Sequence, residues 1–238
     1  GEEQPENKYA CKREYAVHHL KYIPNGGCFP APPCSILIGR MSEMPTVSVI
    51  IPTYNRFPLL AEALESVRAQ VYRDFELILA DDGSDDETRL LEKEPEIRYL
   101  RLKHCGMPGA VRNRGAEVAR GRYLAFLDSD DLWRPEKVAL QVPFLEERPK
   151  IPLVHSREHW LRGEHTVSQK GQRHAREGDV FADALWKCTI GPSTVLMRSE
   201  AFRELGGFDE SLEVAEDYEF WLRLTSRYSV GYIEKPLT

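Results

Sequence analysis

The strongest constraint on the fold is a regular alternation of short apolar runs with segments of helical periodicity, from residue 46 to about residue 147. The apolar runs are rich in β-branched residues, and each precedes a segment with apolar side chains at helical spacing. Four such units in succession predict an α/β fold, with a mostly parallel central sheet flanked by helices. The expected strands are 47–51, 75–80, 97–102 and 123–127, and the expected helices are 58–70, 85–93, a segment from 108 onward, and 135–147.

After about residue 150 the pattern loosens, which predicts a smaller β/α region attached to the main sheet. The chain reaches Thr238 without a closing element, so we expect a domain truncated at its C-terminus. The expected strands here are 152–156, 193–198 and 229–234, the expected helices are 179–187, a short one from 199 to the glycines at 206–207, and 216–224, and 157–178 is expected to be loop or hairpin.

Residues 1–43 have no clear periodicity and a centre rich in Pro, Gly and Cys. We expect a leader that is poorly ordered or not native to the fold. A zinc site is the alternative, but the spacing lacks a Cys-x-x-Cys knuckle. Its ligands would be Cys11, His18 or His19, Cys28 and Cys34.

Composition excludes several classes of protein. The chain has 32 Lys and Arg against 38 Asp and Glu, a net charge of −6, which disfavours a nucleic-acid binder with a general basic surface. The longest charge-free run, 22–39, is interrupted by prolines and glycines and cannot span a bilayer. Five cysteines are an odd number and no disulfide framework, so we expect a reducing cytoplasm.

Polar residues follow three of the first four strands, and the carboxyl ends of parallel strands share one edge of a sheet. We therefore expect Pro52-Thr-Tyr-Asn55, Asp81-Asp-Gly-Ser84 and Asp128-Ser-Asp-Asp131 to meet in one crevice. Carboxylates at 128 and 130 suit Mg²⁺ or Mn²⁺ completed by substrate phosphates, and the alternative is a solvated acidic turn. A tyrosine at 54 offers a ring to a nucleobase, and an aspartate at 82 can accept hydrogen bonds from a base or ribose.

Two further segments carry candidate chemistry. Arg112 lies in a glycine-rich segment that opens a helix, and both arginine and helix N-termini favour phosphate. Glu216-Asp217 opens a later helix, where carboxylates either complement the helix dipole or serve as a general base. His155 and His159 would form a metal pair only on a helix, and their β-rich surroundings disfavour that.

Four segments, in this order, resemble the inverting family 2 glycosyltransferases: VSVIIPTYNR, ELILADDGSDDET, GAVRNRGAEVARGRYLAFLDSDDLWRPEKV and FRELGGFDESLEVAEDYEFWLRL. The resemblance covers about residues 46–235 and implies a GT-A, Rossmann-like fold over 44–238. It also implies a nucleotide-binding half at 44–135 and an acceptor-side half at 136–238. Members of the family usually continue beyond the last strand.

The resemblance also implies roles for individual residues. Asp130 would be a direct metal ligand, Asp128 would lie near the metal or ribose, and Asp217 would take the proton of the acceptor hydroxyl. Tyr54 and Asp82 match positions that hold uracil. The implied nucleotide-binding residues are Pro52, Tyr54, Asn55, Asp82, Arg112, Asn113 and Asp128, and the acceptor side would include Glu216 and Gly191.

The implied reaction moves a sugar, with inversion, from a nucleotide-diphospho-sugar (a UDP-sugar in the first instance) to a hydroxyl of a glycan or lipid-linked acceptor. Mn²⁺ or Mg²⁺ would assist. The implied setting is bacterial surface polysaccharide synthesis in the cytoplasm, with peripheral contact at the inner face of the plasma membrane if the acceptor is lipid-linked. The alternative of another class is a catalytically silent module that binds nucleotide-sugar or glycan. A haloacid dehalogenase-type phosphatase is disfavoured by Leu132-Trp133 after the acidic motif, and a sugar nucleotidyltransferase by the lack of its glycine-rich first loop.

Overall fold

The computed structural model describes residues 44–162, 165–167 and 176–238. The leader at 1–43 and the candidate zinc ligands Cys11, His18, His19, Cys28 and Cys34 lie outside this part of the chain. Within it, no helix combines the length and apolar character needed to cross a bilayer.

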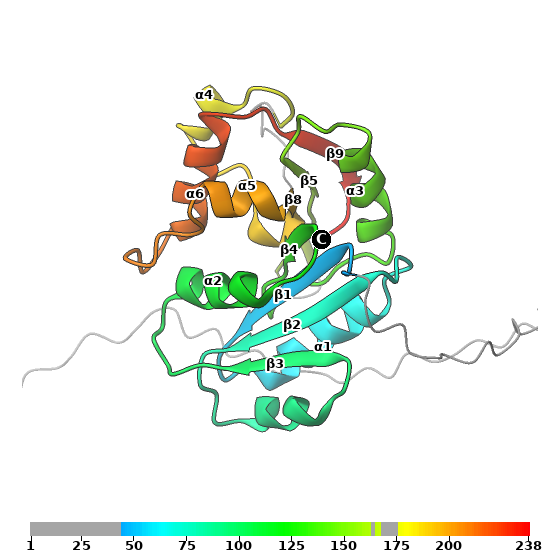
Figure 1. The fold of residues 1–238 in the computed structure, drawn as a ribbon, viewed down its shortest axis with the longest axis vertical. Helices are drawn as coiled ribbons and strands as arrows, with labels where there is room; N and C mark the ends of the chain where they lie inside the picture. The colour runs from blue at the N-terminus through cyan, green and yellow to red at the C-terminus, as the bar shows by residue number, and fades with distance from the viewer. Residues whose placement is uncertain (1–43, 163–164, 168–175) are drawn as a thin grey trace, which may run out of the picture. The chain divides into compact units, whose positions relative to one another are not determined.

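A seven-stranded mixed sheet forms the centre of the fold, in the strand order β3-β2-β1-β4-β8-β5-β9 (Figure 1). The first four of these strands are mutually parallel, β8 runs antiparallel to both β4 and β5, and β9 is parallel to β5. The strands are β1 (Val47–Thr53), β2 (Phe75–Asp81), β3 (Ile97–Arg101), β4 (Tyr123–Phe126), β5 (Leu153–Arg157), β8 (Leu196–Arg198) and β9 (Gly231–Pro236). The prediction of a mostly parallel α/β sheet is confirmed.

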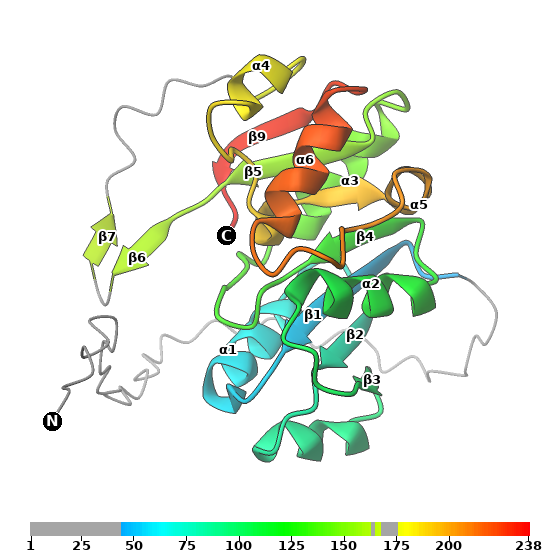
Figure 2. The ribbon, with the colours of Figure 1, turned by 90° about the vertical axis from the view of Figure 1, so that its left-hand side faces the viewer.

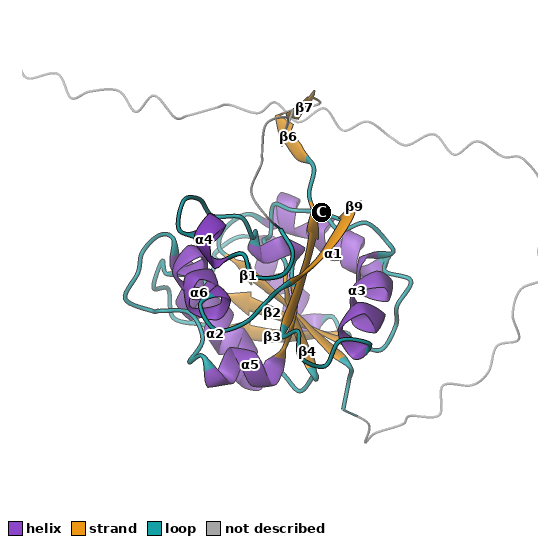
Figure 3. Ribbon diagram, turned by 90° about the horizontal axis from the view of Figure 1, so that it is seen from above, coloured by secondary structure: helices purple, strands orange, loops and turns teal. Residues whose placement is uncertain are grey.

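Helices cover both faces of this sheet (Figure 3). Alternation along β1 sends Val49 and Ile51 into the core under α1 and α3, and Ile50 into the core under α2, α5 and α6. The helices are α1 (Phe57–Arg68), α2 (Pro108–Val118), α3 (Lys137–Glu146), α4 (Phe181–Ala184), α5 (Ser199–Glu204) and α6 (Glu216–Thr225), with 3-10 turns η1 (Glu87–Lys93) and η2 (Pro192–Thr194).

The predicted elements differ from the structure in a few places. The segment at 85–93 forms the 3-10 turn η1 rather than an α-helix. The predicted strand at 193–198 is divided, because Pro192 opens η2 and only 196–198 pair with neighbouring strands. The loop or hairpin at 157–178 contains a hairpin of β6 (Trp160–Arg162) and β7 (His165–Val167), which stands apart from the large sheet in Figure 2.

The last residues of the chain are hydrogen-bonded into the edge of the sheet. The Leu237 carbonyl accepts from the Arg134 amide at 2.9 Å, and the Thr238 carbonyl accepts from the His159 amide at 2.8 Å. The Thr238 hydroxyl donates to the Ser193 carbonyl at 3.1 Å. Strand β9 therefore ends against the loop after β4 and the turn η2.

Candidate functional site

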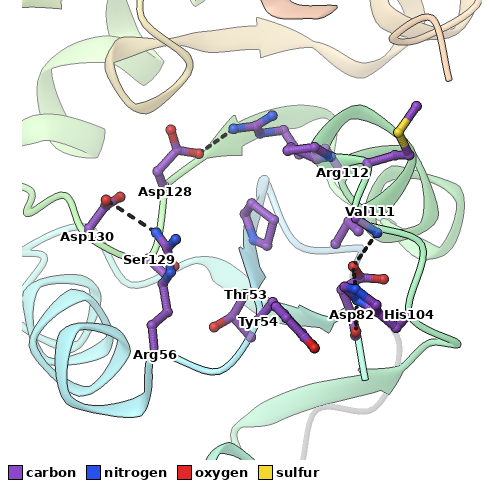
Figure 4. A pocket seen from close by; sticks show the side chains of 14 residues that line it. Thr53, Tyr54, Arg56, Asp82, His104, Val111, Arg112, Asp128, Ser129 and Asp130 are labelled. Atoms are coloured by element: carbon purple, nitrogen blue, oxygen red, sulfur yellow. Dashed lines mark hydrogen bonds and ion pairs between the residues drawn. The ribbon is translucent and has the colours of Figure 1, made fainter. Parts of the chain in front are cut away.

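The carboxyl ends of β1, β2 and β4 open into one pocket of about 430 Å³ (Figure 4). The start of α2 forms another wall, so the expected convergence of the strand ends is confirmed. The pocket is lined by Pro52, Thr53, Tyr54, Arg56, Asp82, His104, Gly106, Met107, Pro108, Val111, Arg112, Asp128, Ser129 and Asp130.

The turn after β1 presents Tyr54 to this pocket. Asn55 has a positive φ of 46°, and its side chain accepts a hydrogen bond from the Asp85 amide at 2.7 Å. Its own amide donates to the Ser84 hydroxyl at 2.9 Å. Asn55 thus joins the turns after β1 and β2 instead of lining the pocket, and this leaves the Tyr54 ring exposed at the rim.

The Asp82 carboxylate organises the chain after β3. It accepts hydrogen bonds from the amides of Cys105 and Gly106, both at 2.9 Å, and its Oδ2 lies 2.8 Å from Nδ1 of His104. The His104 ring in turn stacks on Tyr54, with centroids 4.1 Å apart and planes 16° from parallel. A tyrosine, a histidine and a buried carboxylate therefore form one end of the pocket.

Sequence reasoning did not single out His104, although a signal was present. The strand at 97–102 is followed by Lys-His-Cys-Gly, a polar end like the other three. Because all four parallel strands end at the same edge, this end belongs to the crevice as well.

Arg112 and Asp128 form the opposite wall. The guanidinium of Arg112 donates to Asp128 Oδ1 at 2.5 Å and to Glu216 Oε1 at 2.6 Å. The amide of Asp128 donates to the Ser193 hydroxyl at 3.0 Å, so η2 fixes the start of the acidic turn. Arg112 is buried, and its contact with the partly exposed Asp128 carboxylate is a charge-assisted hydrogen bond, which is stronger than one between neutral groups.

The rest of the acidic turn is less fully neutralised. Asp130 pairs with Arg56 at 3.2 Å, and both side chains are about half exposed. Burial, together with the charges of Asp128, Asp130 and Glu158, raises the pKa of Asp131 to about 6, although a hydrogen bond from Ser193 opposes the rise. The turn thus carries more negative charge than its arginines balance.

This donor set fits a divalent cation of the Mg²⁺ or Mn²⁺ type. Asp128 and Asp130 provide hard oxygen ligands, and the crowded charge beside them favours a cation. Among the described residues, no group of three or more His, Cys, Asp and Glu side chains is arranged to hold a metal. A cation here would accordingly be completed by phosphate oxygens and water, as Mg²⁺ commonly is.

Asp217 lies in the first turn of α6, one residue after Glu216. Burial raises the pKa of the Asp217 carboxyl; a hydrogen bond from the Tyr218 amide and the charge of Arg112 oppose the rise, while the charges of Glu216 and Asp128 favour it. The helix begins after Ala215, whose φ of 62° places a non-glycine residue in the left-handed region. Such backbone strain is concentrated at functional sites.

Several predicted site residues do not line the pocket. Asn113 is buried, and its side chain both donates to and accepts from the backbone of Phe208, so it holds the loop after α5. Glu216 accepts a hydrogen bond from Arg112 and Asp217 follows it in α6, but neither lines the pocket. Gly191 lies near Glu158, whose Oε2 would be 3.1 Å from a Cβ at that position. His155 is on strand β5 and not on a helix, so the spacing needed for a histidine metal pair is absent.

The comparisons with known proteins agree with this geometry. The family model described as glycosyl transferase family 2 matches residues 48–206. An uncharacterized glycosyltransferase of Rickettsia conorii is 36% identical over 196 residues, covering 81% of this chain and 32% of the relative. The Bacillus subtilis glycosyltransferase TuaG, named for teichuronic acid biosynthesis, is 31% identical over 79% of this chain and 75% of its own length. The crystal structure of residues 1–349 of Staphylococcus aureus TarS with UDP superposes with a TM-score of 0.67 at 25% identity, covering 81% of this chain and 59% of that one.

The chain spans about a third of the length of the Rickettsia conorii relative, so the comparison describes one part of a longer protein in that case. The matched family region runs from the second residue of β1 to beyond β8 and contains all the residues that line the pocket. The pocket at the strand ends, the sheet order and the family match lead to one conclusion: the chain belongs to glycosyltransferase family 2 and has the GT-A fold.

Proposed function

We propose that this protein transfers a sugar, with inversion, from a UDP-sugar to a hydroxyl of a glycan or lipid-linked acceptor. The observation that carries the proposal is the arrangement of the pocket. One end has the Tyr54 and His104 rings beside Asp82, and the other has the carboxylates of Asp128 and Asp130. A nucleoside diphosphate needs an aromatic and hydrogen-bonding end for its base and a cation-binding end for its phosphates.

Uridine is the proposed base. TarS is solved with UDP, and it shares 25% identity and the fold with this chain. Uracil presents an N–H that can donate a hydrogen bond to a carboxylate. Asp82 offers such a carboxylate, although two backbone amides and His104 already engage it.

Asp217 is the proposed general base. It would take the proton of the acceptor hydroxyl while that oxygen forms a bond to the anomeric carbon. The bond between that carbon and the diphosphate oxygen breaks, and the UDP leaves with the electron pair. A raised pKa brings a carboxylate closer to the basicity that proton abstraction at neutral pH requires.

Asp128 and Asp130 would hold a divalent cation. When bound, it supplies positive charge that stabilises the departing diphosphate. Arg56, which is about half exposed and pairs with Asp130, can turn toward a phosphate oxygen without breaking core packing.

The acceptor and the pathway are proposed from family context. TuaG is named for teichuronic acid biosynthesis, and it is 31% identical to this chain. We therefore propose a surface polysaccharide or lipid-linked precursor as acceptor, and the cytoplasm or the inner face of the plasma membrane as the place of reaction.

A thermal-shift panel tests the donor assignment. UDP, GDP, CDP, ADP and dTDP are each added with Mn²⁺ and with chelator, and a ligand at 100 times its Kd should add about 2.7 kcal/mol of stability. Stabilisation by UDP that depends on Mn²⁺ is expected. Asp130→Asn should weaken UDP binding only with Mn²⁺, whereas His104→Ala should weaken it with and without metal. Asp85→Asn, an exposed carboxyl outside the pocket, is the matched control. No shift with any diphosphate would refute the assignment.

Turnover is tested separately from binding. Release of UDP from UDP-sugars is followed with and without candidate glycan acceptors, for the wild type and for Asp217→Asn. The variant should bind UDP normally and lose transfer. Unchanged transfer would remove Asp217 as the base, and binding without any turnover in the wild type would favour the silent module.

A further inference from the structure

We infer that Arg112 and Glu216 form a charge bridge, by which we mean that Arg112 links the carboxylates of Asp128 and Glu216. This bridge couples cation binding at Asp128 to the conformation of the first turn of α6, which carries Asp217. The inference rests on the proposed function, because it joins the proposed donor side to the proposed acceptor side. It also gives Glu216 a positioning role in place of the acceptor contact that the family resemblance implies.

Arg112 is hydrogen-bonded to a carboxylate on each side of the bridge. One guanidinium nitrogen of Arg112 donates to Asp128 at 2.5 Å and the other donates to Glu216 at 2.6 Å. The Arg112 and Glu216 side chains are only 6% and 8% exposed, whereas Asp128 is 28% exposed. The bridge therefore runs from a partly exposed carboxylate in the pocket to the buried carboxylate of Glu216, the first residue of α6.

The surrounding backbone is shaped to bring Glu216 close to α2. A Cβ at Gly109, in the first turn of α2, would lie 2.8 Å from Glu216 Cγ, so only glycine allows this approach. On the other side, Ala215 enters α6 in the left-handed region. Glu216 is held between these two features, and Asp217 follows it directly.

The bridge also leaves one donor unused. Nε of Arg112 is buried and has no hydrogen-bond partner among the described residues. The guanidinium is therefore held by the two carboxylates and by the Phe208 ring, whose centroid lies 5.8 Å from Cζ of Arg112. A group held this way can shift toward one carboxylate when the other is engaged elsewhere.

The balance of charges predicts whether cation binding at Asp128 becomes weaker or stronger when Glu216 loses its charge. A single guanidinium charge is shared between Asp128 and Glu216. If Glu216 loses its charge, Arg112 pairs with Asp128 alone, and that stronger pair competes with a cation for the same carboxylate. Binding of a diphosphate without metal should not weaken, because the wall of the pocket has become more positive.

The principal test measures the Kd of UDP by calorimetry for the wild type and Glu216→Gln, with Mn²⁺ and with chelator. Binding with Mn²⁺ should weaken about fivefold or more, the lower part of the usual range for coupled sites. Binding with chelator should stay the same or tighten. Glu219→Gln, which removes the i,i+4 ion pair with Arg223 on the same helix, should change neither value. Equal weakening in both conditions, or no weakening with Mn²⁺, would overturn the inference.

A second measurement needs no ligand and so separates this inference from the proposed function. Asp128→Asn should alter hydrogen exchange at the amides of Tyr218 and Glu219 when Glu216 is present, and leave it unchanged in a Glu216→Gln background. An equal change in both backgrounds would overturn the bridge. If Glu216→Gln does not fold, Arg112→Lys serves instead, because lysine keeps the charge but cannot span two carboxylates as a guanidinium does. A wild type that binds no nucleotide refutes the proposed function, and the exchange experiment then decides the bridge.

Discussion

Replacing Asp131 with asparagine should stabilise the protein in a manner that depends on pH. Burial and the charges of Asp128, Asp130 and Glu158 raise the pKa of the Asp131 carboxyl to about 6, against an ordinary value of 3.8. The folded state therefore binds its proton more tightly than the unfolded state. The contribution of Asp131 to the free energy of unfolding therefore falls as pH rises from about 4 to about 6, and it does not fall further above that pH.

The size of this loss follows from the two pKa values. At about 1.4 kcal/mol per pH unit, the interval from 3.8 to about 6 corresponds to roughly 3 kcal/mol. Asparagine has nearly the same shape and can still accept the hydrogen bond from Ser193, so its main effect is to remove the charge. For a domain of this size, Asp131→Asn should raise Tm by roughly 6–12 °C at neutral pH.

The assay is thermal unfolding of both proteins in chelator at several pH values from about 4 to about 8. The difference in Tm should be small at the acid end and reach its maximum above about pH 6.5. A difference that does not vary with pH would refute the argument. Adding Mn²⁺ and UDP should shrink the difference, because a cation at the acidic turn offsets the repulsion that the variant removes.

Three further predictions follow from other parts of the structure. Gly109→Ala and Gly115→Ala should each gain about 1 kcal/mol of folding stability from helix propensity and lose about 1–3 kcal/mol to overpacking. The added Cβ would contact Glu216 at position 109 and Ile50 at position 115. Only Gly109→Ala should therefore weaken Mn²⁺-dependent UDP binding, measured by calorimetry. Burial lowers the pKa of Lys137 well below 10.5, so the folded state holds fewer protons than the unfolded state; the wild type should gain stability relative to Lys137→Met as pH rises toward 10.5, measured by denaturant unfolding. Since the pKa of Asp217 is raised and the proposed base must be ionised, the rate of transfer should fall as pH drops through a value above 3.8, and a rate that is flat down to 3.8 would contradict the assignment.

The sheet and the location of the pocket could be predicted from the sequence because both depend on local patterns. A short apolar run rich in β-branched residues marks β1, helical spacing marks α1, and parallel strands place their ends at one edge. Asp82 and Asp128 were recognisable because they follow strands directly. The divided strand at 193–198 was not recognisable, because its first half pairs with no neighbouring strand and this depends on the tertiary environment.

The side-chain partners could not be predicted, because they join residues distant in sequence. Asn113 contacts the backbone of a residue 95 positions later, and Arg112 contacts one 104 positions later. Each is a polar residue on a helix with many possible partners. Burial selects among them, since a buried polar group must find a hydrogen bond, and burial depends on the completed fold.

The hydrogen bond from the Thr238 hydroxyl to the Ser193 carbonyl makes Thr238, two residues after β9, a position from which the site can be observed without labelling the pocket. The Ser193 hydroxyl also accepts a hydrogen bond from the Asp128 amide. Two hydrogen bonds through Ser193 therefore connect the acidic turn to Thr238. A fluorophore attached at Thr238 should therefore respond to nucleotide binding in its emission, without any label inside the pocket. For the same reason, a bulky side chain substituted at position 238 would lie beside Ser193, which holds the acidic turn in place.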